Sequence, residues 1–174
     1  MMSGGKMKRI ISLLCMSLFV FACTPQPQIS DYKKGIEAAK NKQYEQAIVF
    51  FDTAAKTEQD KDIAANALYN AGLCYGILEK FEDEINYYKK AIEVSDSCQP
   101  ALYDLGMYYN KNGDNENSLK MFEKLIQVNP THEGAFYMVG LIYSETGDKE
   151  KSEEYFQKAA ELGSPEAQAA INKK

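Results

Sequence analysis

Residues 99–132 read QPALYDLGMYYNKNGDNENSLKMFEKLIQVNPTH, and this stretch decides the fold. Its first half carries an apolar stripe with helical spacing that ends at the turn sequence Asn-Gly-Asp. That stripe comprises Leu102, Leu105, Gly106 and Tyr109. A second stripe follows and ends at Asn-Pro; it comprises Ser118, Leu119, Phe122, Leu125 and Ile126. Two amphipathic helices joined by a tight turn predict an antiparallel helical hairpin.

The hairpin pattern recurs along the chain. Glycines stand 34 residues apart at Gly72, Gly106 and Gly140, and a tyrosine follows each of them three residues later. Glycine inside a helix costs about 1 kcal/mol relative to alanine, so its return at a fixed phase needs a compensating gain. A period in this range is typical of a solenoid.

The residues of this unit resemble a tetratricopeptide repeat. The pattern is Leu102-x2-Leu105-Gly106-x2-Tyr109, then Ser118-x3-Phe122, then Pro130. Two other units match it, namely Leu68-x2-Ala71-Gly72-x2-Tyr75 with Tyr88 and Ala91, and Phe136-x2-Val139-Gly140-x2-Tyr143 with Ser152-x3-Phe156. A first unit keeps Gly35, Ala47, Phe51 and Ala54 but has Lys34 and Ala38 where the family prefers Leu and Tyr. In this family the glycine allows the two helices of a hairpin to approach closely.

The resemblance implies an all-α fold, a right-handed α-solenoid of about four helical hairpins with a C-terminal capping helix. We expect the hairpins at about 30–61, 65–98, 99–132 and 133–164, and the capping helix at 165–174. Solenoids need such a cap because the last hairpin otherwise exposes an apolar face. Gly163, Ser164 and Pro165 suit a helix stop and restart. Ala167, Ala170 and Ile171 should face the repeats.

One position of the second repeat departs from the family. The family places a small residue where this chain has Ala47, Ser118 and Ser152, but the second repeat has Glu84. Its carboxylate either extends to solvent at the edge of the hairpin or marks a local opening.

The N-terminus has the layout of a bacterial lipoprotein signal peptide. A short basic segment precedes an uncharged, largely apolar run of 13 residues, Ile10 to Ala22, which is too short to span a bilayer. Val20-Phe21-Ala22-Cys23 resembles a lipobox, with Phe21 bulkier than usual, so residues 1–22 are expected to be cleaved and Cys23 lipidated. Several acyl chains give stable membrane anchoring. An ordinary secretory leader and an uncleaved anchor are the alternatives, and Met7 is a second possible start.

Charge and the tether bear on location. The leader holds three basic and no acidic residues, so its removal changes the formal net charge from −5 to −8, which argues against a nucleic-acid partner. Residues 24–28 form a Pro/Gln spacer that reaches only ~15 Å, so the repeats should stay near the membrane. Thr24, rather than Asp, follows the lipid cysteine, and by resemblance to enterobacterial lipoproteins this favours the outer membrane.

Two cysteines remain after the leader and the lipid site are set aside. If equivalent helices stack in parallel, Cys74 and Cys98 should be offset by roughly 15 Å along the axis. A disulfide requires Cα atoms within about 7 Å. We therefore expect Cys74 to be a small core residue and Cys98 to be a free thiol in a loop.

The sequence offers little for catalysis. His132 is the single histidine, and no second residue completes an acid–base pair or a triad with it. There is no Gly-rich phosphate loop and no Cys/His spacing for a metal. We predict a protein that is not an enzyme and that uses no cofactor, metal ion or small-molecule substrate.

A second stripe on the first helix of each repeat is the candidate binding site. Its large side chains stand four apart and share one helix face, which lines the concave groove in the tetratricopeptide family. They are Tyr69 with Leu73, Tyr103 with Met107, and Tyr137 with Leu141, accompanied by the polar residues Asn70, Asn110 and Lys111. The alternative is that the tyrosines only pack on one another. Repeats that clamp acidic carboxyl tails use Lys and Asn where this chain has Tyr and Leu or Met, which argues against that mode.

These features predict a membrane-anchored module that binds a segment of a partner protein in the bacterial cell envelope, as a scaffold or accessory subunit of a complex. The alternative is a structural lipoprotein that associates with itself and has no distinct client.

Overall fold

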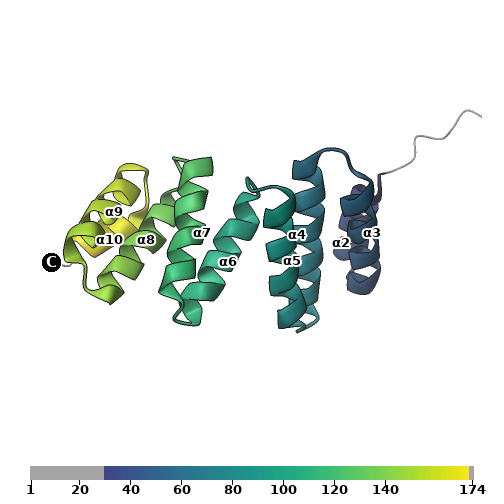
Figure 1. Cartoon of the computed structure of the whole chain (residues 1–174), viewed down its shortest axis with the longest axis horizontal. Coiled ribbons are helices and arrows are strands. Elements are labelled where there is room, and N and C mark those ends of the chain that lie inside the picture. The colour runs from purple at the N-terminus through teal and green to yellow at the C-terminus, as the bar shows by residue number, and fades with distance from the viewer. Residues whose placement is uncertain (1–29, 173–174) are drawn as a thin grey trace, which may run out of the picture.

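The computed structural model describes residues 30–172. The predicted leader, the lipid site Cys23 and the spacer lie outside the described residues. Within them the chain forms nine helices and no strands (Figure 1). The helices are α2 (Asp31–Lys40), α3 (Tyr44–Thr57), α4 (Lys61–Ile77), α5 (Phe81–Val94), α6 (Gln99–Lys111), α7 (Asn115–Val128), α8 (Glu133–Thr146), α9 (Lys149–Glu161) and α10 (Pro165–Asn172). None of these helices is long and apolar enough to cross a bilayer.

Consecutive helices pair into antiparallel hairpins that succeed one another along the long axis of the molecule (Figure 1). The pairs are α2/α3, α4/α5, α6/α7 and α8/α9, and α10 packs on α9. Side chains fix several helix starts: Asp60, Asp114 and Asp148 each accept a backbone N–H of the first turn. The predicted all-α solenoid is confirmed.

Each hairpin is held together by one repeated contact between a glycine and an aromatic ring. A Cβ atom on Gly106 would lie 2.9 Å from Cζ of Phe122, which is fully buried on α7. The other hairpins repeat the contact with the same 16-residue spacing, in the pairs Gly35–Phe51, Gly72–Tyr88 and Gly140–Phe156. The glycines therefore make the close helix approach possible, as the repeat pattern predicted.

The turn inside each of the four hairpins contains one residue with a left-handed backbone conformation. Gly113 and Gly147 adopt φ values of 76° and 86°, which cost glycine little. The equivalent turns of the first two repeats hold Lys42 and Glu79, both at φ 60°, where a side chain is strained.

The apolar core falls into three clusters of buried side chains. The first extends from Ala38 to Ala101 and the second from Leu102 to Ile142, so the division falls within α6. The third lies beneath α10, where Ala167 is buried and Ala170 and Ile171 pack against the last hairpin, as predicted. The apolar core is therefore divided where the second and third repeats meet.

The two cysteines are both free and both buried, with exposures of 3% for Cys74 and 5% for Cys98. The core position of Cys74 is confirmed, and Cys98 is a free thiol in the loop before α6 as predicted, although it is also buried. Because α6 begins at the next residue, Cys98 is the N-cap of that helix and packs into the core of the preceding repeat. Burial raises the pKa of both thiols.

A polar link joins the start of α4 to the loop before α6. The hydroxyls of Ser95 and Ser97 both donate to Oδ1 of Asp62, at 2.6 and 2.9 Å. These hydrogen bonds lower the pKa of the Asp62 carboxyl below 3.8 because they favour its charged form.

Candidate functional site

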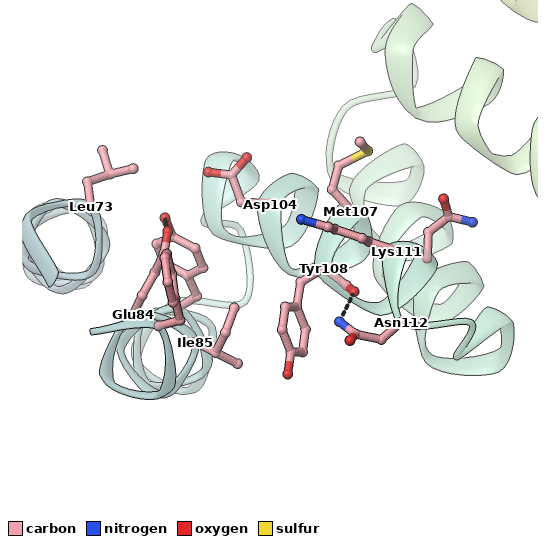
Figure 2. Close-up of a pocket in the computed structure, with 11 residues that line it drawn as sticks. Leu73, Glu84, Ile85, Asp104, Met107, Tyr108, Lys111 and Asn112 are labelled. Atoms are coloured by element: carbon pink, nitrogen blue, oxygen red, sulfur yellow. Dashed lines mark hydrogen bonds between the residues drawn. The ribbon is translucent and has the colours of Figure 1, made fainter. Parts of the chain in front are cut away.

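A cleft of about 840 Å³ lies between the second and third repeats, where the core divides. It is bounded by α4, α5 and α6 (Figure 2). We call it the inter-repeat cleft, and its lining residues are Leu73, Phe81, Glu84, Ile85, Tyr88, Asp104, Met107, Tyr108, Asn110, Lys111 and Asn112. Figure 2 shows Leu73, Glu84 and Ile85 on one side of the opening and Asp104, Met107 and Lys111 on the other.

The cleft gathers large apolar side chains that remain exposed. Phe81 is 62% exposed, Met107 39% and Tyr108 40%. Single exposed apolar residues are ordinary, but several that line one hollow are typical of a binding surface.

Glu84 lines this cleft. Of the two expectations for it, a carboxylate that extends to solvent or a local opening, the structure favours the local opening. Its side chain is half-buried, and Oε1 accepts a hydrogen bond of 2.8 Å from the Tyr88 hydroxyl. Gly76 of α4 provides the room, because a Cβ there would lie 2.7 Å from both Cδ and Oε1 of Glu84. The carboxylate is thus held against α4 at the opening between the repeats.

At two positions eight residues apart, this repeat has a small residue where the third repeat has a larger one, and a large residue where the third repeat has a small one. Gly76 and Glu84 correspond, at the 34-residue period, to Asn110 and Ser118 in the third repeat. Ser118 is fully buried, and its hydroxyl donates to the carbonyl of Gly106 at 2.9 Å. The second repeat instead combines the smallest residue on α4 with a long acid on α5, and the acid extends into the cleft.

The predicted row of tyrosines packs mainly within the repeats. Tyr69, Tyr103 and Tyr137 are half-buried. Each ring contacts an aromatic ring on the second helix of its own repeat. The contacts are Tyr69–Tyr88 at 5.2 Å, Tyr103–Phe122 at 5.6 Å and Tyr137–Phe156 at 5.7 Å between ring centroids. These geometries give the tyrosines a structural task in addition to any contact with a partner.

A second hollow of about 410 Å³ adjoins the cleft at Asp104 and is lined by residues of α4, α6 and the start of α8. Asp104 lines both hollows, and Tyr69, Tyr103 and His132 line the second one. His132 caps α8, with Nδ1 accepting the N–H of Ala135 at 3.2 Å, and its ring stacks on Tyr103. The single histidine is therefore engaged as a cap.

The remaining predicted groove residues separate into two groups. Leu73, Met107, Asn110 and Lys111 line the inter-repeat cleft. Asn70 lies outside it and donates to the Tyr32 hydroxyl and the Asn66 carbonyl, and Leu141 packs against the core. Ile85 and Tyr88 from α5 and Asp104 from α6 also line the cleft, and the sequence pattern did not predict them. The departure at Glu84 was the one signal that pointed to this boundary.

Asn110 has an unusual environment at the cleft. Its Nδ2 atom is buried and has no hydrogen-bond acceptor among the described residues. A buried donor without an acceptor costs about 1–3 kcal/mol, so native proteins seldom keep one without a reason.

Antiparallel hairpins in series, with an open cleft at one repeat boundary, define a helical-repeat protein of the α-solenoid class. A family model described as tetratricopeptide repeat matches residues 65–98, 99–132 and 134–162, more than half of the chain. The chain belongs to the tetratricopeptide repeat family.

Several solved structures have the same fold. The crystal structure of MamA has 24% sequence identity and a TM-score of 0.62, with 79% of each chain covered. YrrB, described as a TPR protein with an unusual peptide-binding site, has 22% identity and a TM-score of 0.61 over 83% of this chain and 73% of its own. A tetratricopeptide repeat protein from Parabacteroides merdae ATCC 43184 has 21% identity and a TM-score of 0.67 over 80% and 55%. A search of curated protein sequences gave no match.

Proposed function

We propose that this protein is a lipid-anchored, non-catalytic binding module of a bacterial envelope complex, and that a segment of a partner protein binds in the inter-repeat cleft. The observation that carries the proposal is the cleft itself, about 840 Å³ in volume and lined by exposed Phe81, Met107 and Tyr108. Burying these side chains under a partner segment is favourable because it removes apolar surface from water. YrrB, which has a similar fold, is described as having an unusual peptide-binding site, and this supports a peptide segment as the ligand.

The expected anchor gives the module its location. A lipid on Cys23 of the lipobox-like Val20-Phe21-Ala22-Cys23 would lie eight residues before α2, which begins at Asp31. An extended tether of that length reaches ~25 Å, so the repeats stay close to the membrane and meet partners there. Thr24 after the lipidated cysteine favours the outer membrane.

Metabolic labelling with a palmitate analogue tests the anchor. Wild-type protein is expected to incorporate the label and to sediment with outer-membrane vesicles. Cys23→Ser is expected to lose the label and to leave the membrane fraction. Equal labelling of both proteins would refute lipidation at Cys23.

Crosslinking in membranes of the native host tests the cleft. The exposed Met107 is a better probe than the three groove tyrosines, whose removal would disturb the packing within each repeat. Met107→Gln keeps a good helix former and removes apolar contact surface, so the crosslinked partner is expected to be lost. Val49→Gln is the matched control, because Val49 is 62% exposed on α3 and lies outside the cleft.

Two outcomes would change the proposal. A partner that is retained by both variants would move the binding site away from the cleft. An elution volume that reports growing size with concentration, without a crosslinked partner, would favour a self-associating lipoprotein instead.

A further inference from the structure

The cleft contains two carboxylates that are fixed by one pair of stacked rings. The Tyr88 hydroxyl donates to Oε1 of Glu84, and the Tyr69 hydroxyl donates to Oδ2 of Asp104, both at 2.8 Å. Tyr69 and Tyr88 stack on each other with centroids 5.2 Å apart. The chain of contacts Glu84–Tyr88–Tyr69–Asp104 therefore crosses the repeat boundary and sets the positions of both acids.

Both tyrosines remain donors over the whole physiological range. Burial, and secondly the hydrogen bond to the carboxylate, raises the pKa of Tyr69 and of Tyr88 well above the usual value. Each hydroxyl occupies one carboxylate oxygen, Oε1 of Glu84 and Oδ2 of Asp104. Within residues 30–172 the second oxygen of each acid accepts no hydrogen bond.

The two negative charges at the opening, on Glu84 and Asp104, are not neutralised by ion pairs within the repeats. In residues 30–172 the ion pairs join other lysines and acids, and neither Glu84 nor Asp104 takes part in one. Lys111 is the single cation in the cleft lining, and it is exposed rather than paired with either acid. Two carboxylates against one free ammonium leave the cleft acidic.

The walls between the acids suit a long aliphatic stem. Leu73 and Ile85 lie on one side of the opening and Met107 on the other (Figure 2). Arginine and lysine bury their methylenes against such surfaces while the charged group extends to a polar partner. A guanidinium has donors in a fixed fork and can bridge two carboxylates, which an ammonium does less well.

We propose that the inter-repeat cleft binds a cationic side chain of the partner segment, arginine in preference to lysine, between Glu84 and Asp104. This inference rests on the proposed function and specifies the chemistry of the partner. The aliphatic stem lies on Leu73, Ile85 and Met107, and the charge meets the two acids that the stacked tyrosines hold. Residues 10–174 contain no arginine, so the repeats themselves do not supply this ligand.

The experiment uses the full chain in detergent and a phage-displayed library of random 12-residue peptides. Wild-type protein is expected to enrich peptides with arginine or lysine at one recurring position. The selected peptide is then measured by fluorescence polarisation. Its affinity is expected to fall as salt rises, because the interaction is between charges.

Isosteric neutral variants test the assignment to the two acids. Glu84→Gln combined with Asp104→Asn keeps an acceptor for each tyrosine and removes both charges, so the peptide is expected to bind at least about tenfold more weakly. Glu93→Gln combined with Glu123→Gln makes the same change in net charge outside the cleft and is expected to bind normally. Lys111→Gln removes the competing cation and is expected to bind more tightly.

A second route displaces one acid without changing any charge. In Gly76→Ala the new methyl group must push the Glu84 carboxylate aside, since it would otherwise lie 2.7 Å from Cδ and Oε1. Binding of the basic peptide is expected to weaken several-fold. Alanine favours the helix, so this variant keeps the test valid if the double neutral variant fails to fold.

The results distinguish this inference from the proposed function. Enriched peptides without a basic position, or equal binding by the double neutral variant, would overturn the cationic ligand and leave a peptide groove that Met107→Gln still disrupts. The inference would also be overturned if the library yields no peptide whose binding is weakened by Met107→Gln. In that case crosslinking in native membranes decides separately whether the cleft binds a partner.

Discussion

Replacing Gly106 with alanine tests the contact that closes each hairpin. A Cβ on Gly106 would lie 2.9 Å from Cζ and 3.0 Å from Cε1 and Cε2 of Phe122, a ring that is fully buried. Alanine gains about 1 kcal/mol of helix propensity, whereas overpacking costs about 1–3 kcal/mol. We therefore expect Gly106→Ala to lower the free energy of unfolding by up to about 2 kcal/mol.

Gly134→Ala is the matched control for this prediction. A Cβ on Gly134 of α8 would lie 3.4 Å from Cε1 of His132 and 3.5 Å from Cε2 of Tyr103, which are ordinary contacts. This variant should be stabilised by up to about 1 kcal/mol, so the two alanine variants should differ by about 1–3 kcal/mol. At this chain length each kcal/mol corresponds to about 2–4 °C in Tm.

Thermal melts followed by circular dichroism measure the difference. A double variant, Gly106→Ala with Phe122→Leu, should be more stable than the sum of the two single changes by at least about 0.5 kcal/mol, because the smaller side chain gives room to the methyl group. If Gly106→Ala were stabilised as much as Gly134→Ala, the close-approach argument would be wrong for every hairpin.

Four other predictions follow from the same structure. Glu79→Gly should raise the free energy of unfolding by up to about 1 kcal/mol, and with it the Tm, because the left-handed turn strains the glutamate; an unchanged Tm would contradict the strain. Asp62→Asn should destabilise the protein at pH 7, since the lowered pKa means that the hydrogen bonds to the charged carboxylate stabilise the fold above pH 3.8. That difference should shrink in melts below this pH as the folded protein takes up the proton. Native Cys74 and Cys98 should resist alkylation by iodoacetamide and react once unfolded in urea; rapid native labelling would show that they are accessible. Asn110→Ala removes a buried donor without an acceptor, so its Tm should be unchanged or higher, and a large loss would reveal an unseen partner.

The sequence predicted the helical hairpins because the feature that forms them is local and periodic. The same 16-residue pairing of glycine and aromatic ring holds in the first repeat, where Gly35 meets Phe51 although the flanking residues depart from the pattern. The cap was predictable for a similar reason, since Gly163 at φ 102° and the Ser164 N-cap are encoded in adjacent residues.

The inter-repeat cleft was only partly predictable because it depends on how two repeats meet. The pattern on α6 placed Met107 and Lys111 on one face, but it did not reveal which side chains of α5 would reach them. The burial of Cys98 was missed for the same reason, since it follows from the packing of one repeat on the next. Spacing within a repeat predicts a face, whereas contacts between repeats decide what that face encloses.

The exchange of size between Gly76 and Glu84 has a consequence for sequence variation. Since the carboxylate occupies the space that a side chain at position 76 would need, neither residue can change alone without altering the cleft. Related chains that keep a long acid at this position of a repeat should keep glycine eight residues earlier. A long acid at position 84 should therefore covary with glycine at position 76. Replacing Asn110 with glycine and Ser118 with glutamate should open an acidic cleft at the next repeat boundary.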